Sequence, residues 1–392
     1  MLGPYIANED KTISYKGNNV FSPITNITKI RPSIREIKGR VGAMKHNPLW
    51  THIAAINHRI NLSANQYFDE RGALFTALPL TTRMISSPGA VYGKEAISYT
   101  SDTCPITLNW FDLPQKAFLS ESSQIYLELA LMPEGVNHVY SIYNSFRKEK
   151  ADVTHLSEFH HIEYEGKVSQ KQNEKTALGL VGRTISDLLN KNEKDMAFFL
   201  PEKKLEELAN MASNIQNIPR LTYKEAQKAL FNATRNPKYK TFTMQNCFGS
   251  WEEIKLTELY GGMVAITQFP LLEVPFYHAR VEGTEHEVED FRKGSKKKSF
   301  VADNTDIIWP GYRETIGSGH RVRSEKELEE KAKIFQLPRE DYEPYLQTRK
   351  FGNYVETSGF GLGWERMLQG MLEMPFIWSA AQFPRIDKTL KP

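Results

Sequence analysis

The chain has little cysteine. Its 392 residues include two, Cys104 and Cys247, which lie far apart in the sequence. Two distant thiols are too few to form a metal cluster or the disulfide framework of a small secreted domain. Those classes are excluded, and we expect both cysteines to be buried thiols in a reducing cytosol.

Long apolar runs are also lacking. No run reaches the roughly 20 apolar residues that are needed to cross a bilayer. Residues 1–17 do not have the basic-then-apolar order of a signal peptide. The sequence therefore predicts a cytoplasmic protein without a membrane partner.

A strong excess of either charge is absent, since the formal net charge is +3. Proteins that bind nucleic acid by neutralising phosphates usually carry a clear basic stripe. The one dense basic run here extends from Arg292 to Lys298, between two strand-like stretches. We interpret it as a solvated hairpin tip, and contact with a phosphate backbone is the alternative.

The chain divides into two parts by its pattern. Residues 1–44 are polar, rich in proline, glycine and asparagine, and without a clear period. They are too few for an independent nucleic-acid-binding barrel, so we expect an N-terminal arm or extension. Residues 45–392 alternate between strand and helix patterns with few crossover helices, which predicts an α+β fold built on an antiparallel sheet flanked by helices.

Hydrophobic periodicity locates the main elements. A helix is predicted from Pro48 to about Gly72, followed by a strand over 73–78 that runs into Pro79. Residues 175–235 and 324–336 read as helical. Further strands are predicted at 116–119, 139–143, 158–163, 263–267, 275–278 and 305–309.

Glycine occupies every second position of a strand-like stretch near the C-terminus, at Gly359, Gly361 and Gly363. Glycine is costly in a strand because it loses more entropy on folding and packs nothing. The pattern makes sense where a planar ligand or another backbone comes close, although bulges and tight corners also use glycine. Arg366, in the first turn of the following helix, would then face the ligand.

An arginine and an aromatic residue lie at corresponding places on two consecutive strands. Arg147 follows one strand and Phe159 lies on the next. A guanidinium at a strand end can bind a phosphate or carboxylate in a bidentate manner, and a phenyl ring offers a face to a base. For this segment in isolation, a surface pair of Arg147 and Glu149 is the simpler interpretation.

Two carboxylates accompany a second glycine-rich stretch. Asp306 and Glu314 lie on neighbouring predicted strands, just before Gly317 and Gly319. Carboxylate oxygens are the ligands that a nucleotide-bound Mg²⁺ prefers. A salt-bridged sheet edge is the alternative.

Taken together, these segments resemble the class II aminoacyl-tRNA synthetases, and the asparaginyl/aspartyl subfamily in particular. Arg147 with Phe159 is similar to motif 2, residues 359–366 to motif 3, and the helix ending at 67–72 with its strand to motif 1, which forms the dimer of that family. Other stretches are similar to asparaginyl-tRNA synthetases: 118–128, 221–226, 341–346 and 382–385. The resemblance covers residues 47 to about 386.

The resemblance implies a class II synthetase-type sheet and ATP-dependent, AMP-forming chemistry. In that family the carboxylate of an amino acid attacks the α-phosphorus of ATP, which gives an acyl-adenylate and pyrophosphate. The protein contributes position and charge neutralisation. Arg147 and Arg366 are the implied catalytic residues.

Roles for the remaining residues also follow from the resemblance. Phe159 and Arg366 would sandwich the adenine over Gly361 and Gly363. Glu149 would orient the base and His155 would lie near the terminal phosphates. Asp306 and Glu314 would hold Mg²⁺.

The resemblance places the amino acid near Gln124 and Arg321, with Arg321 on its side-chain oxygen. Aspartyl enzymes carry a lysine three residues after the pocket glutamine. This chain has Leu127 there, followed by Glu128, as asparaginyl enzymes do. Without a buried cation a second carboxylate is disfavoured, so an amide side chain fits better than aspartate.

The chain also departs from the family. Its residues 1–44 are too few for the family's anticodon-binding barrel. The motif 2 loop, 150–154, is short and lacks the arginine before His155. Residues 86–89 lack the acidic group that holds the substrate's α-ammonium, and a histidine before motif 3 is replaced at 356–357.

These departures lead to three hypotheses. The first is a freestanding, homodimeric ligase, similar to archaeal asparagine synthetase, that activates asparagine, aspartate or a related acid and transfers it to ammonia or another small amine. The alternative is tRNA aminoacylation, which the missing barrel disfavours. The third is a catalytically silent paralogue that binds ATP or an amino acid.

Overall fold

The computed structural model describes residues 3–16, 19–21, 32–87, 91–92, 95–96, 105–240, 248–290, 295–352 and 354–391. Cys104 and Cys247 lie outside these residues, so the expectation of two buried thiols stays a prediction. None of the helices in the described segments is long and apolar enough to cross a membrane.

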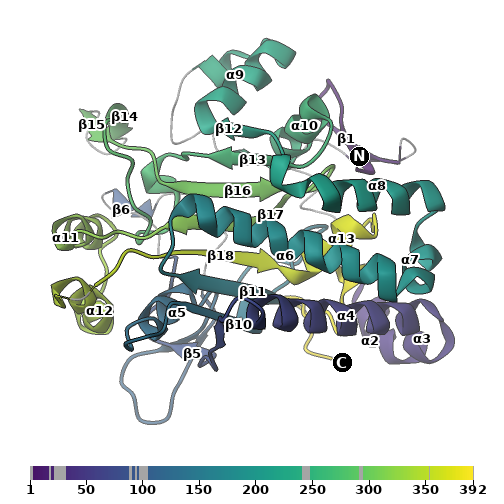
Figure 1. The fold of residues 1–392 in the computed structure, drawn as a ribbon, viewed down its shortest axis with the longest axis horizontal. Helices are drawn as coiled ribbons and strands as arrows, with labels where there is room; N and C mark the ends of the chain where they lie inside the picture. The colour runs from purple at the N-terminus through teal and green to yellow at the C-terminus, as the bar shows by residue number, and fades with distance from the viewer. Residues whose placement is uncertain are drawn as a thin grey trace.

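An eight-stranded sheet forms the centre of the fold (Figure 1). Its strand order is β12-β13-β16-β17-β18-β11-β10-β4. Neighbouring strands from β13 to β10 are antiparallel, and the two edge strands pair in parallel. The strands are β4 (Leu74–Phe75), β10 (His138–Phe146), β11 (Glu158–Gly166), β12 (Arg220–Thr222), β13 (Val264–Thr267), β16 (Asn304–Ile308), β17 (Glu314–His320) and β18 (Ser358–Gly363). This arrangement confirms the predicted α+β class.

Helices surround the sheet, and α6 runs across one face of it between α4 and α8 (Figure 1). The helices are α2 (Ile34–Lys38), α3 (Arg40–His46), α4 (Leu49–Asp69), α5 (Gln124–Ala130), α6 (Gln170–Lys191), α7 (Glu193–Phe199), α8 (Glu202–Asn214), α9 (Tyr223–Thr234), α10 (Ser250–Tyr260), α11 (Glu325–Ile334), α12 (Arg339–Leu346), α13 (Trp364–Met371) and α14 (Ile377–Ala380).

Local sequence explains where α6 begins and which side it buries. The Ser169 side chain accepts a hydrogen bond from the Gln172 backbone N–H, and the Gln172 side chain bonds back to Ser169, which satisfies two free donors at the helix start. Ala177, Val181 and Ile185 recur at helical spacing and are buried. This stripe packs α6 onto the sheet.

The central strands present different residues to the two faces of the sheet, since successive side chains alternate. Tyr164 of β11 and Phe360 of β18 point toward α4, and their rings stack with centroids 5.4 Å apart. Phe68 of α4 stacks on Tyr164 at 5.7 Å. The other face therefore carries Gly359, Gly361 and the odd-numbered residues of β11.

The described parts of the predicted N-terminal arm pack on the large domain. Strands β1 (Tyr5–Ala7), β2 (Ile13–Tyr15) and β3 (Asn19–Phe21) form a small sheet. Tyr5 is 3% exposed and its ring lies 5.2 Å from that of Tyr312. The indole N–H of Trp251 in α10 donates to the Asn8 carbonyl over 2.8 Å. These contacts fix the segment against α10.

Two predicted strands differ from the structure. The stretch 275–278 forms no strand, because Pro270 and Pro275 withdraw two ladder donors. It contains instead a 3₁₀ turn at Leu271–Glu273 and a single bridge from His278. The strand predicted over 73–78 is reduced to the two residues of β4, at the sheet edge.

The predicted hairpin tip, Arg292 to Lys298, lies only partly within the described residues: 292–294 are outside them, and Lys296 to Lys298 belong to a strand of a hairpin and not to its tip. Strands β14 (His286–Asp290) and β15 (Ser295–Ser299) pair so that Lys296 and Lys298 stand opposite Glu289 and Glu287. Two lysine positions of β15 therefore lie opposite two glutamate positions of β14 in the strand register.

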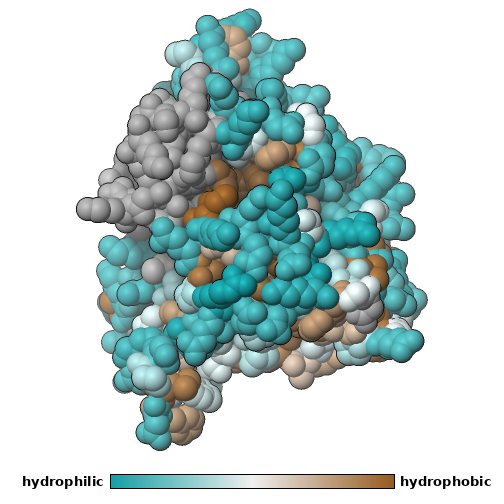
Figure 2. All heavy atoms as spheres, turned by 90° about the vertical axis from the view of Figure 1, so that its left-hand side faces the viewer, coloured by the Kyte–Doolittle hydropathy of each residue, from teal (hydrophilic) through white to brown (hydrophobic). Residues whose placement is uncertain are grey.

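The remaining strands form two small sheets. They are β5 (Thr81–Thr82), β8 (Thr107–Leu108) and β9 (Ala117–Leu119) in one, and β6 (Val91–Tyr92) and β7 (Glu95–Ala96) in the other. Figure 2 shows the side of the molecule at the left of Figure 1, where apolar side chains gather in a hollow with a hydrophilic border.

Candidate active site

A cavity of about 420 Å³ lies on the glycine face of the sheet. Its walls come from α5, from strands β11, β16, β17 and β18, and from the segment 273–278. A smaller hollow of about 90 Å³ adjoins it and shares Arg147, His155, Gly361 and Arg366. Between them these hollows are lined by most of the predicted site residues: Gln124, Arg147, Glu149, His155, Phe159, Asp306, Glu314, Arg321, Gly361, Gly363 and Arg366.

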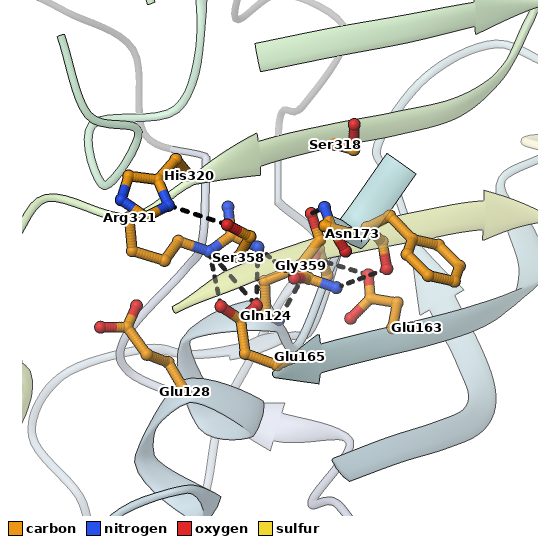
Figure 3. A network of polar contacts seen from close by, with 12 residues as sticks. Gln124, Glu128, Glu163, Glu165, Asn173, Ser318, His320, Arg321, Ser358 and Gly359 are labelled. Atoms are coloured by element: carbon orange, nitrogen blue, oxygen red, sulfur yellow. Dashed lines mark hydrogen bonds and ion pairs between the residues drawn. The ribbon is translucent and has the colours of Figure 1, made fainter. Parts of the chain in front are cut away.

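Gln124 and Arg321 line the cavity, and Glu165 joins them in one polar network (Figure 3). Arg321 donates through Nε to Glu165 over 3.0 Å and through Nη2 over 2.7 Å, and Nη2 also donates to Gln124 Oε1. The Gln124 amide donates in turn to the Phe360 carbonyl at 3.0 Å. All three side chains are buried, so the trio is a fixed polar wall.

Gly359 is required by this trio. A Cβ on Gly359 would meet the ends of Glu165, Arg321 and Gln124, the nearest within 2.6 Å or less. Protein side chains and not a ligand therefore explain this glycine. The other two predicted glycines differ, because Gly361 and Gly363 line the smaller hollow directly.

Charge in this wall is compensated within the protein. Burial opposes the charge of Arg321, but the adjacent Glu165 carboxylate outweighs it and raises the pKa of the guanidinium. Arg321 therefore stays protonated beside an acidic partner. Charge-assisted pairs of this kind are held in one geometry.

Glu163 is a site residue that sequence reasoning missed. It lines the cavity two residues before Glu165 on β11, accepts hydrogen bonds from Ser122 Oγ at 2.8 Å and Ser123 N at 3.2 Å, and is 1% exposed. Burial raises the pKa of its carboxyl. The alternation of β11 was the available signal, since 159, 161, 163 and 165 share one face.

The smaller hollow is lined by Arg147 and Phe159. The Arg147 guanidinium carbon lies 5.3 Å from the centre of the Phe159 ring, and Arg147 Nε is buried with no hydrogen-bond partner among the described residues. His155 is oriented by Asp152, whose carboxylate lies 2.9 Å from His155 Nδ1. The sequence predicted His155 but not this positioning residue.

Arg366 is anchored at both sides. Its Nε donates to the Thr154 carbonyl at 3.3 Å and Nη1 donates to the Glu314 carbonyl at 3.0 Å. Burial lowers its pKa, and the nearby Arg313 contributes. Two backbone carbonyls thus hold the guanidinium in the lining of the smaller hollow, which Phe159 also lines.

Asp306 and Glu314 converge above Gly317. A Cβ on Gly317 would lie 2.7 Å from Glu314 Oε1 and 4.0 Å from Asp306 Oδ1. Burial, followed by the charges of Glu314 and Glu253, raises the pKa of Asp306 well above its usual range. Crowded carboxylates with oxygen donors fit a hard divalent cation. Among the described residues no group of three or more acidic, histidine or cysteine side chains could hold a metal alone.

The structure places Leu127 and Glu128, which the resemblance puts at the substrate, outside the cavity lining. Leu127 is fully buried in an apolar cluster with Leu131 and Val139. Glu128 accepts from the Tyr345 hydroxyl at 2.7 Å and pairs with Arg349. Both lie one turn beyond Gln124 on α5, so they share its side of the helix but lie about 5 Å farther along the helix axis, against β10 and α12.

Comparison with known proteins agrees with this geometry. The model of the family "tRNA synthetases class II (D, K and N)" matches residues 36–387. The asparagine–tRNA ligase of Thermus thermophilus is 29% identical over 360 residues, covering 89% of this chain and 74% of that protein. The asparagine–tRNA ligase of Thermococcus kodakarensis is 31% identical over 73% of this chain and 60% of its own length.

Solved structures show the same fold. The asparaginyl-tRNA synthetase of Pyrococcus horikoshii, complexed with asparaginyl-adenylate, superposes with a TM-score of 0.75 at 24% identity, over 100% of this chain and 83% of that one. The aspartyl-tRNA synthetase of Entamoeba histolytica gives 0.67 at 17% identity, over 93% and 64%. The chain therefore belongs to the class II tRNA synthetases of the D, K and N type, and it is a ligase with the catalytic core of the asparaginyl/aspartyl subfamily.

Proposed function

We propose that this chain uses ATP to activate asparagine as an aminoacyl-adenylate and transfers the asparaginyl group to tRNA. The observation that carries the proposal is that Arg321 and Arg147 line one cavity, which Arg147 also joins to the smaller hollow with Phe159 and Arg366. The names of the relatives, asparagine–tRNA ligases, support tRNA as acceptor. These names favour tRNA aminoacylation, the alternative hypothesis of the sequence analysis, over transfer to a small amine.

The compensated charge of Arg321 supports asparagine over aspartate. Arg321 already pairs with Glu165, so a second carboxylate would add an unpaired negative charge to a buried wall. A carboxamide adds none, and its carbonyl oxygen can accept from Arg321. Binding a neutral carboxamide at Arg321 therefore costs less free energy than binding a carboxylate there.

In the proposed reaction an oxygen of the substrate carboxylate attacks the α-phosphorus, and the bond from that phosphorus to pyrophosphate breaks. Arg147 would neutralise charge on the α-phosphate and hold the attacking carboxylate. Phe159 and Arg366 would hold the adenine between them. His155, oriented by Asp152, would contact the outer phosphates.

Asp306 and Glu314 would hold a magnesium ion on those phosphates. The ion would supply positive charge that screens the phosphate oxygens. Its positive charge would also offset the burial, and the neighbouring carboxylates, that raise the pKa of Asp306. With two protein carboxylates, phosphate oxygens and water would complete the coordination.

A homodimer belongs to the same proposal. Motif 1 corresponds to α4 and β4, and Leu74 and Phe75 of β4 are 55% and 56% exposed in the single chain. Two adjacent apolar side chains on an edge strand are typical of an interface.

Transfer to ammonia or another small amine is the second candidate, and one observation favours it. The motif 2 loop is folded into the protein, with Ala151 and Val153 buried and the Val153 carbonyl accepting from Ile377 N at 2.9 Å. A loop held this way presents little to the end of a large acceptor.

Pyrophosphate exchange tests the first half of the proposal. The purified chain would be assayed with ATP, Mg²⁺ and each amino acid, with and without tRNA. Exchange with asparagine well above aspartate is expected. Exchange with none of them would contradict the proposal and leave a silent paralogue.

Acceptor identity needs a second assay. Labelled asparagine, ATP and total tRNA should give acid-precipitable label, and ammonia or hydroxylamine in place of tRNA should not raise turnover. The reverse pattern would favour amine transfer.

A further inference from the structure

His278 stands beside Arg321 at the substrate end of the cavity. The two residues form an isolated antiparallel bridge, and residues opposite each other in such a bridge point to the same side. Both side chains line the cavity. His278 is 7% exposed, so its ring is part of the wall and not of the rim.

The imidazole lies flat on Gly319. A Cβ on Gly319 would approach His278 Cε1 to 2.7 Å and Nδ1 to 2.8 Å, closer than real contacts allow. Glycine at this position therefore makes room for the ring. The ring of the 275–278 segment thus fits closely onto strand β17. The backbone hydrogen bonds of either segment do not require this contact.

The ring packs edge-on against Tyr277, with the centroids 5.2 Å apart, but one of its nitrogens is unused. His278 Nδ1 is buried and has no hydrogen-bond partner among the described residues. The backbone is used, since His278 N donates to Pro275 O at 3.1 Å and His278 O accepts from Lys331. A buried ring nitrogen without a partner is destabilising, and such groups recur where a ligand completes the bonding.

Its surroundings keep the imidazole neutral. Burial, followed by the charges of Arg321, Lys331 and His320, holds the pKa of His278 well below its ordinary value. A neutral imidazole has one donor and one acceptor nitrogen, whereas a guanidinium has donors alone. The two neighbours thus offer a complementary pair.

We propose that His278 is a specificity-determining residue that accepts a hydrogen bond from the side-chain amide of the substrate, while Arg321 donates to the carbonyl oxygen of that amide. This rests on the proposed function and extends it. A terminal carboxamide presents an acceptor and a donor side by side, which matches the pair. A carboxylate lacks the donor, and a side-chain cation would face Arg321.

The test compares two substrates in three variants by pyrophosphate exchange. Asparagine is compared with 2-amino-4-oxopentanoate, in which a methyl group replaces the amide nitrogen and the carbonyl stays. The wild-type chain should prefer asparagine by at least about tenfold in kcat/KM, because the methyl ketone leaves a buried polar group of the site unpaired. In His278→Phe this preference should fall to near unity, with KM for ATP within about twofold of wild type.

Two further variants separate recognition from folding. Gly319→Ala should displace the imidazole and lower the preference for asparagine without removing any polar group. His320→Phe is the matched control, because His320 bonds outside the cavity to Ser358 and Glu356. It should retain the wild-type preference.

The outcomes distinguish a failure of the role of His278 from a failure of the proposed function. Exchange by the wild-type chain with an unchanged substrate preference in folded His278→Phe and Gly319→Ala would overturn the role of His278 alone. Absence of asparagine-dependent exchange in the wild-type chain would overturn the proposed function and the role together. Circular dichroism of each variant shows whether it is folded.

Discussion

Arg366 Nη1 donates to the backbone carbonyl of Glu314 over 3.0 Å. This bond joins the first turn of α13 to the start of β17, so the guanidinium expected on the adenine and the carboxylate expected on the metal are held by one contact. The smaller hollow, which we propose binds the nucleotide, is therefore braced between α13 and β17. Substitutions of Arg366 and of Glu314 should both affect adenylate formation.

Removing Arg147 or Arg366 should abolish adenylate formation. Each Arg→Ala change deletes a charge-assisted contact to the reacting phosphates or the base. Such a contact is worth about 3 kcal/mol in the transition state, roughly a hundredfold in rate. Pyrophosphate exchange measures the loss.

Arg183→Ala is the control for this pair, since Arg183 bonds to Glu70 and Asp187 on the helical face. It should exchange normally. Near-normal rates in either site variant would show that the guanidinium does not contact ATP.

Asp306→Asn and Glu314→Gln should raise KM for ATP and the Mg²⁺ requirement more than KM for asparagine. The reason is that each removes one of two carboxylates that would hold the ion on the phosphates. Titrating Mg²⁺ in the exchange assay is the measurement. Unchanged ATP and Mg²⁺ dependence in both variants would make the pair structural.

The free energy of unfolding should decrease as the pH rises from about 4.5 to about 7, because of Glu121. Burial raises the pKa of this carboxyl from 4.5 to about 7, and its Oε1 accepts from Ser87 N at 2.7 Å. The folded chain thus binds the proton more tightly than the unfolded chain, so unfolding free energy decreases as pH rises through this window, by at most about 3 kcal/mol.

Urea denaturation at pH 5 and pH 8 measures this slope. Glu121→Gln, which stays neutral, should reduce it. An equal change with pH in the variant and the wild type would assign the effect to other groups, and Glu202→Gln on exposed α8 controls for charge alone.

The chain should sediment as a dimer of twice 45.0 kDa. Leu74→Glu should shift it toward monomer, because an exposed edge leucine would be replaced by a charge at the interface. Sedimentation velocity at micromolar concentration is the measurement. A wild-type monomer under those conditions would contradict the assignment of α4 and β4 to motif 1.

Much of the fold and the motif segments could be predicted from local features. The stripe of Ile53, Ile56 and Ile60 marks α4 by its period, and the confirmed helix differs from the prediction by a few residues at its end. The strand over 73–78, which is reduced to β4, and the stretch 275–278 were exceptions, and the second has a clear cause. Its composition is strand-like, but prolines on either side remove donors, and its place is set by packing and not by a ladder.

Some candidate site residues could also be predicted from local patterns, and others could not. Arg147, Phe159 and Arg366 stand next to recognisable local patterns, and the structure brings all three to one hollow. Leu127 and Glu128 were expected at the substrate from the resemblance, because aspartyl enzymes carry a lysine at the position of Leu127. In the structure they lie one helical turn farther along α5 than Gln124, against Val139 and Tyr345, and these partners are distant in sequence.

The sequence by itself determined the α+β class, the family and the residues that line the smaller hollow, because these depend on period, spacing and residue type within short segments. Only the tertiary structure decided that Glu165, 156 positions before Arg321, compensates its charge. It also decided that His278 lies beside that arginine on Gly319. Strand register and long-range burial determine such pairings, and neighbours in sequence carry no record of either.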